Sequence, residues 1–227
     1  MAFTFEQKID RVREIALRKE NMTIAEVRLL ISDVSSIFVR LCLENGSDRR
    51  AITRITTKLR DAGRRSPPWK PTSSRVPGRP QDGSDGNRIL RWLLSTDHKF
   101  YANELMATLT EVKYYLQLLS MNDAPPLPPN TLQKCFSWLI EHDVEPGLYL
   151  DPIQLTPISL NSIIADAKEI QSGHLHPLDR GGKHEPKNAF LMLQRSNQLQ
   201  GNLTVEELVA LMGEIVRKHN ERKLRQP

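Results

Sequence analysis

Apolar residues near the start of the chain recur with the 3.6-residue period of an amphipathic helix. The first stripe is formed by Phe5, Ile9, Val12, Ile15 and Ala16. A capping box at residues 23–26 then opens a second helix, and Asn45-Gly46 stops it. A third helix is expected from residue 47 or 48 to residue 62, with Gly63 as its stop. These stripes are expected to form the core of a mainly helical N-terminal region.

The helical pattern breaks at residues 64–87, which contain five prolines and three glycines. Such a composition excludes a regular helix and favours an extended, polyproline-like path, so we expect a basic arm or linker there. Further helices are expected at 87–94, 102–119 and 130–141. The predicted organisation is a helical region at 1–63, the arm at 64–87, a second helical region at 88–145 and a distinct unit at 146–227.

With 227 residues, 39% of them hydrophobic, the chain can bury a core of moderate size. It has no run of about 20 apolar residues, which a membrane span needs, and its start lacks the apolar stretch of a secretory signal. We therefore expect a cytoplasmic protein with no membrane partner. Cys42 and Cys135 cannot build a disulfide framework or a four-thiolate zinc site, and both are expected as buried thiols.

Positive charge is concentrated in one part of the chain. The formal net charge is +5, but between Arg49 and Arg91 twelve Lys and Arg residues stand against three acids. Because the guanidinium of arginine can bind a phosphate through two hydrogen bonds, this segment favours nucleic-acid binding. The alternative is a basic face that only contacts solvent. The arginines of the arm that are expected to contact DNA are Arg64, Arg65, Arg75 and Arg79.

From residue 146 the helical pattern gives way to short extended runs, turn residues and clustered polar groups. Three of the six histidines lie between residues 174 and 184. The polar and turn positions of this segment are, in order, His174, His176, Pro177, Gly181, Gly182, His184, Asn188, Asn197 and Gly201.

This order resembles the HNH, or ββα-metal, nuclease motif, in which a histidine, a proline, a Gly-Gly turn, an asparagine and a short helix with a second Asn or His follow one another. The resemblance covers about residues 148–220 and is strongest to restriction-type HNH endonucleases. Residues 148–158 resemble the hairpin that usually precedes the motif. The resemblance implies an α+β chain, with the helical N-terminal region followed by a small C-terminal ββα-metal (HNH) unit.

The resemblance also implies roles for individual residues. His174, on the first strand, is expected to be the general base, since a neutral imidazole accepts a proton near pH 7. Asn188, at the end of the second strand, is expected to orient it, and Asn197, on the helix, to ligate a divalent metal, Mg²⁺ or Mn²⁺. His184 is expected to brace the turn. Flanking contacts to phosphate are expected from Arg180 and Arg195, which are solvated surface charges in the alternative interpretation.

The chain departs from the family pattern at one ligand position. Gly173 stands where the family commonly has an Asp or His as a second metal ligand. His176 is the first candidate for that role, with Asp166 or Glu169 as alternatives, and otherwise the protein holds metal poorly or not at all. Paired cysteines that hold structural zinc in many relatives are absent as well. We expect no structural zinc.

Packing would then have to replace the zinc. Two segments are candidates: the apolar run at 189–193, and a C-terminal helix that opens with a capping box at 204–207. The apolar stripe of that helix comprises Leu208, Leu211 and Ile215.

The function predicted from the sequence is a metal-dependent HNH endonuclease that hydrolyses phosphodiester bonds in DNA, of the site-specific restriction type. Because one HNH site cuts one strand at a time, a homodimer is a possible assembly. The rival hypothesis is a non-catalytic DNA-binding or regulatory protein that uses a degenerate HNH fold, and Gly173 is the residue that favours it. An RNA-binding module is disfavoured because only 6% of the residues are aromatic and no aromatic stacking motif is present.

Overall fold

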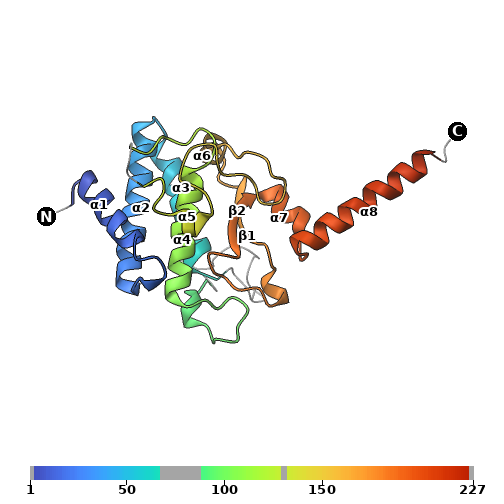
Figure 1. The fold of residues 1–227 in the computed structure, drawn as a ribbon, viewed down its shortest axis with the longest axis horizontal. Helices are drawn as coiled ribbons and strands as arrows, with labels where there is room; N and C mark the ends of the chain where they lie inside the picture. The colour runs from blue at the N-terminus through green and yellow to red at the C-terminus, as the bar shows by residue number, and fades with distance from the viewer. Residues whose placement is uncertain (1–2, 67–87, 129–131, 225–227) are drawn as a thin grey trace, which may run out of the picture.

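Helices surround a small two-stranded sheet in the computed structural model, which describes residues 3–66, 88–128 and 132–224 (Figure 1). The expected α+β class is confirmed. The elements are α1 (Phe5–Ala16), η1 (Lys19–Asn21), α2 (Ile24–Glu44), α3 (Arg49–Arg64), η2 (Arg91–Leu93), α4 (Glu104–Leu119), α5 (Ser137–Ile140), α6 (Leu160–Ala165), β1 (Ile170–His174), η3 (Leu178–Arg180), β2 (Ala189–Leu193), α7 (Gln194–Gln200) and α8 (Val205–Leu224).

The long helices begin where a side chain satisfies their first free N–H groups. Thr4 and Thr23 form complete capping boxes at α1 and α2. Asp48 caps α3 and Asn103 caps α4, each by accepting from the backbone N–H three residues on. The expected helices in these regions are confirmed, with α3 continuing two residues beyond the predicted end at residue 62.

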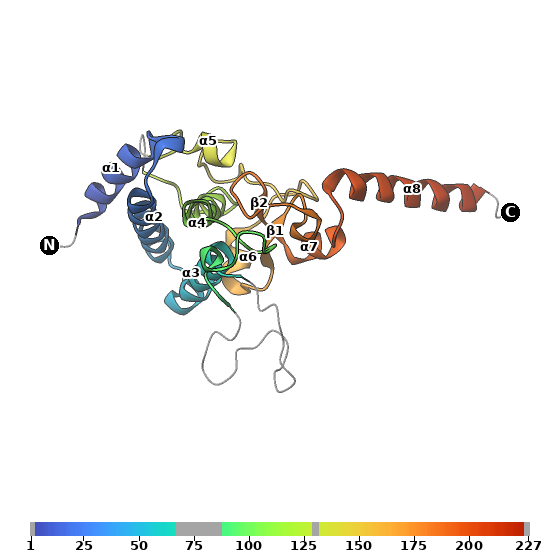
Figure 2. The same ribbon diagram turned by 90° about the horizontal axis from the view of Figure 1, so that it is seen from below.

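Helix α4 is the central element of the helical body, as the view along it in Figure 2 shows. All its residues from Ala107 to Leu119 are buried, because α2 and α3 pack on it from one direction and β2 from another. Its polar side chains therefore need partners inside the protein. Glu111 forms an ion pair with Arg64 of α3, and Gln117 accepts a hydrogen bond from the N–H of Leu191 in β2. The helix thus joins the N-terminal body to the sheet.

The C-terminal part has the predicted ββα order. Strands β1 and β2 are antiparallel, with a register that runs from Ile170 opposite Leu193 to His174 opposite Ala189. Helix α7 follows β2 directly and ends at Gly201, whose φ is +55°. Ile170 and Leu191 belong to the same cluster of buried side chains as the helical body. One continuous core therefore supports both parts.

Three sequence predictions in the middle of the chain are wrong in extent. Residues 88–94 contain only the short η2, preceded by a bridge between Arg65 and Leu90, because the backbone there pairs with the end of α3. The described part of 130–141 contains only α5. The hairpin expected at 148–158 is reduced to a single bridge between Leu150 and Pro157. Of the two cysteines expected as buried, Cys42 is buried and Cys135 is half-buried.

Helix α8 corrects the expectation that its apolar stripe packs on the body. Its capping box is present, since Thr204 and Glu207 exchange backbone-to-side-chain hydrogen bonds. Leu208 is buried, but Leu211 and Ile215 are exposed, because the helix projects away from the rest of the protein in both views (Figures 1 and 2). The packing that was expected to replace zinc does not extend beyond the first turn of this helix.

Asp151 explains why residues 148–158 form a turn instead of a hairpin. Its carboxylate is fully buried and accepts from the N–H groups of Ile153 and Gln154, which folds the chain back on itself. It also accepts from the Ser196 hydroxyl and from the N–H of Leu193. Asp151 therefore holds the junction of β2 and α7.

Replacing Asp151 with alanine should lower the free energy of unfolding by about 3 kcal/mol, because four donors lose a charged acceptor and at least one remains buried without a partner. Urea denaturation monitored by circular dichroism measures the change. Asp179→Ala, which removes an exposed carboxylate paired with Lys99, is the matched control and should cost under about 0.5 kcal/mol. Equal losses in the two variants would contradict the role assigned to Asp151.

Candidate functional site

The loop between β1 and β2 is held in shape by Asn188. Its Nδ2 donates to the carbonyl oxygens of His176 and Lys183, both at 2.9 Å, and its Oδ1 accepts from the N–H of His176 at 2.8 Å. Asn188 immediately precedes β2, whereas the sequence prediction placed it at the end of that strand. The side chain orients the backbone that follows His174, and it makes no hydrogen bond to the imidazole.

The Gly-Gly pair lets this loop close tightly. Gly181 has a φ of +89°, in the left-handed region that favours glycine. At Gly182 a Cβ atom would overlap the carbonyl of His176, so the backbone can approach only without a side chain. The turn predicted from the two glycines is therefore confirmed.

His174 is hydrogen-bonded to a second histidine that the sequence prediction treated as a brace of the turn. The Nε2 of His174 lies 2.9 Å from the Nδ1 of His184, and the Nε2 of His184 lies 2.8 Å from the carbonyl oxygen of Gly63 at the end of α3. A carbonyl oxygen only accepts, so His184 carries its proton on Nε2. Its Nδ1 then accepts from the Nε2–H of His174, which leaves the Nδ1 of His174 with a free lone pair.

Burial keeps both imidazoles neutral. Desolvation, reinforced by the positive charge of Arg91, lowers the pKa of His174 to about 3. The same two causes, with desolvation the larger, lower the pKa of His184 well below its ordinary value. At neutral pH the pair therefore consists of two uncharged rings in one defined tautomeric arrangement.

Asn197 lies with Gly173 on the face of β1 that α7 covers. Its Nδ2 donates to the Oε1 of Gln171 at 2.9 Å, which leaves its Oδ1 facing position 173. A Cβ atom on Gly173 would lie 3.2 Å from that oxygen and would collide with the side chain of Met192. The two positions at which the resemblance implies metal ligands are thus neighbours, and the thioether of Met192 fills the space that a side chain at 173 would take.

His174 and Asn197 are on opposite faces of β1, because successive side chains of a strand alternate. A cavity of about 480 Å³ lies along this strand, and Gln171, Ser172 and His174 line it on the strand side. The cavity is also lined by the basic residues Lys58, Arg88 and Arg91 and by the acid Asp61. The cavity therefore brings the expected base together with cations of the helical region.

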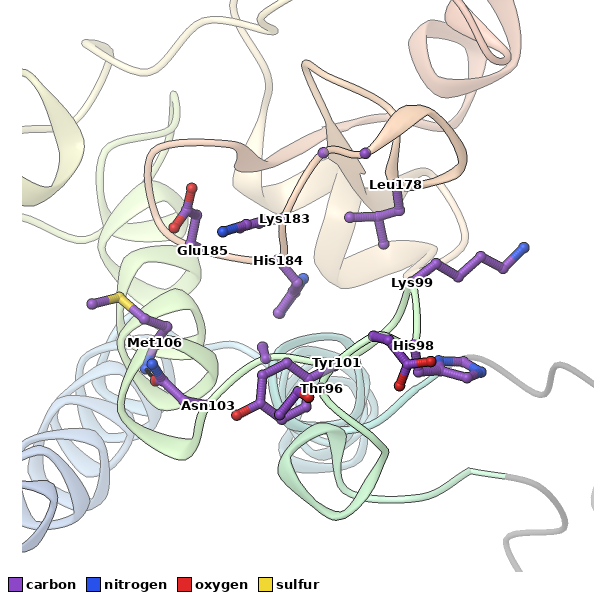
Figure 3. Close-up of a pocket in the computed structure, with 14 residues that line it drawn as sticks. Thr96, His98, Lys99, Tyr101, Asn103, Met106, Leu178, Lys183, His184 and Glu185 are labelled. Carbon is purple, nitrogen blue, oxygen red and sulfur yellow. Dashed lines mark hydrogen bonds between the residues drawn. The ribbon is translucent and has the colours of Figure 1, made fainter.

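A second cavity, of about 490 Å³, lies between residues 96–106 and the loop at 178–185 (Figure 3). His184 and Lys183 face it from the loop, and Thr96, Tyr101 and Asn103 face it from the other side. His174 does not line this cavity. It is therefore a separate feature of the surface.

The structure places the arginines that were expected to contact DNA in varied surroundings. Arg64 pairs with the buried Glu111, and Arg65 lies 3.8 Å from Asp61. Arg180 is exposed and pairs with Glu207 at the start of α8, and Arg195 is exposed on α7. Arg75 and Arg79 lie outside the described residues.

His176, the candidate second metal ligand, is exposed in the loop, where its Nε2 lies 2.9 Å from the carbonyl oxygen of Arg180. Asp166 and Glu169 are exposed before β1. Within the part of the chain that the structure describes, no three His, Cys, Asp or Glu side chains are grouped closely enough to hold a metal ion. An oxygen from Asn197 is thus the donor that the motif itself supplies.

Three residues that line the cavity beside β1 were not predicted from the sequence as site residues, namely Arg91, Lys58 and Gln171. Arg91 gave one signal, since it is a charged residue inside the apolar run Ile89-Leu90-Arg91-Trp92-Leu93. A charge at such a position is rarely buried without a partner. Lys58 and Gln171 have no comparable signal in the sequence.

No family model matches the chain, and no curated protein matches it in sequence. Among solved structures, a crystal structure of a type II restriction endonuclease is similar with a TM-score of 0.45 and 16% sequence identity. The alignment covers 54% of this chain and 55% of that one, so it spans about half of each. A similarity of this degree does not transfer a function. None of the helices in residues 3–66, 88–128 and 132–224 is long and apolar enough to cross a membrane.

The pair of neutral histidines, of which His184 is buried and His174 half-buried, should make the protein sensitive to mild acid. In the unfolded chain a histidine titrates near pH 6.5, so below that pH only the unfolded state takes up these two protons, and the free energy of unfolding falls as the pH falls. We expect a loss of about 2 kcal/mol between pH 7 and pH 5.5, measured by urea denaturation.

Replacing His184 with glutamine should roughly halve this slope, because one of the two protons is then missing. His219→Gln, in which an exposed histidine of α8 is replaced, is the control and should leave the slope unchanged. A wild-type stability that does not change between pH 7 and pH 5.5 would refute the neutral state of the pair.

Proposed function

We propose that the protein is a metal-dependent DNA endonuclease of the HNH type, with a restriction-type, site-specific enzyme as the finer hypothesis. The observation that carries the proposal is the ββα unit itself. Strand β1 ends at His174, Asn188 fixes the connecting loop, and α7 presents Asn197 to position 173. These residues thus belong to one ββα unit, although Asn188 precedes β2 and His174 and Asn197 lie on opposite faces of β1 instead of converging as the resemblance implies.

His174 is suited to accept a proton from water. Its Nε2–H is held by His184, so the free nitrogen is Nδ1, and its low pKa keeps this nitrogen unprotonated at neutral pH. In the proposed reaction a water oxygen attacks the phosphorus atom, its proton passes to Nδ1, and the bond from phosphorus to the leaving oxygen breaks. His184, held by Gly63, acts as a positioning residue.

Near Gly173 the described part of the chain offers one oxygen donor, so we propose that Mg²⁺ or Mn²⁺ would be held only weakly there. The Oδ1 of Asn197 is a hard oxygen donor, and water and phosphate oxygens complete such sites readily. A bound divalent ion supplies neutralisation of the charge on the phosphate and the leaving oxygen. Because the chain offers so few oxygen donors here, we expect metal to bind appreciably only together with DNA.

The rival function is a DNA-binding protein without catalysis, and a specific observation favours it. The space beside Asn197 that a second ligand would need is filled by the side chain of Met192. Wild-type protein that binds DNA but leaves it uncut in both metals would support this alternative and refute the nuclease proposal.

Cleavage of plasmid DNA in Mg²⁺ or Mn²⁺, with EDTA as the negative control, tests the proposed activity. His174→Ala should reduce the cleavage rate by about 10² to 10⁴-fold with DNA affinity unchanged, because it removes the base. His98→Ala, at a histidine beside the second cavity, should keep wild-type activity. Near wild-type cutting by His174→Ala would exclude His174 from the mechanism.

The ligand position can be tested in the same assay. The double variant Gly173→Asp/Met192→Ala should cut at a lower metal concentration than Met192→Ala alone, since the new carboxylate lies beside the Oδ1 of Asn197. Isothermal calorimetry with Mn²⁺ on the free proteins should show the same gain. Tight Mn²⁺ binding by the wild type would show that another residue already completes the site.

A further inference from the structure

Arg91 is a buried cation without a counter-ion in the described part of the chain. Its side chain is 97% buried, since only 3% of the residue is exposed. One terminal nitrogen donates to the carbonyl oxygen of Phe100 and the other to that of Ala62, both at 3.2 Å, and its Nε has no partner. Of the five N–H donors of a guanidinium, two are therefore used.

The cavity around Arg91 has an excess of positive charge. Its charged lining residues are Lys58, Asp61, Arg88 and Arg91. The single acid, Asp61, pairs with Arg88 at 3.1 Å, and the Nζ of Lys58 donates to the carbonyl oxygen of Ala167 at 2.6 Å. No acid that lines the cavity therefore pairs with Lys58 or Arg91, although the carboxylate of Asp166, outside the lining, interacts electrostatically with Lys58.

A buried charge that only carbonyl groups solvate is costly, and an anion in the cavity would offset that cost. Guanidinium groups bind phosphate through several N–H donors at once, and the cavity, at about 480 Å³, has room for one. The same cavity is lined by His174. An anion held there would lie beside the residue that the proposed function uses as its base.

We propose that this cavity is a phosphate-binding site in which Arg91 is the principal ligand and Lys58 assists. That the phosphate belongs to the DNA backbone rests on the proposed nuclease function. The site itself does not, because it follows from the unpaired Arg91 and the basic lining of the cavity.

Inorganic phosphate, titrated into metal-free protein at constant ionic strength, tests the site without DNA or catalysis. In ¹⁵N-labelled protein the Nε–H resonance of Arg91 should shift in a saturable manner. The Nε–H resonance of Arg28, which is already paired with Glu104 on the surface, should not. An unmoved Arg91 resonance, or parallel shifts of the two, would overturn the proposal.

Two variants separate binding from folding. Lys58→Met should weaken phosphate binding several-fold, whereas Arg28→Gln should leave it unchanged, with thermal denaturation in chloride as the folding control for both. Equal phosphate affinity in Lys58→Met and the wild type would contradict the assignment of Lys58. A protein that binds phosphate but does not cut DNA would refute only the nuclease proposal, and the reverse result would refute only the phosphate site.

Helix α8 has an exposed apolar face. Beyond Leu208 this helix carries apolar residues that no other described residue covers. Their exposed fractions are 42% to 65%. They are Val209, Leu211, Met212, Ile215 and Val216. Contiguous apolar surface of this kind marks an interaction site. Gly213, between Val209 and Val216 on the same stripe, has open space around the position of a Cβ atom and would permit a close approach of another backbone.

The distribution of charge along α8 indicates which partner covers this apolar face. Its first half, residues 205–214, contains three glutamates and no basic residue, for a charge of −3. Its second half, residues 215–224, contains four basic residues and one glutamate, for a charge of +3. Within one copy Glu207 already pairs with Arg180 and Glu214 with Lys218. Two copies of the helix packed antiparallel would still place each acidic half against a basic half, whereas parallel packing would oppose like charges.

We infer that α8 pairs with α8 of a second copy of this chain in an antiparallel arrangement. Sedimentation equilibrium of the full chain should give twice the 26.0 kDa of one copy at micromolar concentration. Met212→Glu/Val216→Glu should raise the dissociation constant at least tenfold. Lys168→Glu, at an exposed residue before β1, is the control and should not change it.

A charge exchange tests the antiparallel arrangement. Glu206→Lys/Glu214→Lys and Lys218→Glu/Arg222→Glu should each dimerise more weakly than the wild type, and the two variants mixed should regain part of the affinity. A 26.0 kDa mass at 200 μM, or a dimer that none of these substitutions weakens, would overturn the inference.

Discussion

The hairpin that carries the candidate site depends on hydrogen bonds from outside it. Two strands of five residues are marginally stable alone, so their polar groups and their register need support. The support converges on Leu191, whose N–H is bound by Gln117 of α4 and whose carbonyl oxygen accepts from the hydroxyl of Tyr149. On the other side of the loop, Lys113 of α4 donates to the carbonyl oxygen of Pro186. Burying the polar side chains of α4 costs desolvation free energy, but their hydrogen bonds fix β2, the strand that positions α7.

Local signals predicted the long helices and the ββα unit, whereas the helices expected at 87–94 and 130–141 are much shorter than predicted. Thr23, Asp48 and Thr204 start helices because the capping interaction lies within three residues of sequence, and Gly201 ends α7 for an equally local reason. The hairpin expected at 148–158 failed because Asp151 folds its neighbours into a turn and binds Ser196, 45 residues away. Alternation along a short strand does not reveal such a partner.

The site, too, could be predicted only in part from the sequence. The places of His174 and Asn197 on the strand and the helix followed from the motif, and so did the turn at the two glycines. The partner of His184 is the backbone of Gly63, and a carbonyl group has no sequence signature. Likewise, only the folded protein shows that Arg91 reaches the end of α3 and faces the cavity beside β1.

The hydrogen bond from His184 to the carbonyl oxygen of Gly63 joins residues that are 121 positions apart. The geometry of the motif therefore depends on a distant part of the chain. Closing a loop of that length has an entropic cost that short-range contacts do not have, so the contact depends on the packing of the helical body against the hairpin. The orientation of His174 is therefore a property of the whole fold. The last third of the sequence contains the motif but not Gly63, whose carbonyl oxygen sets the tautomer of the two histidines. The ββα unit of this protein therefore depends on α3.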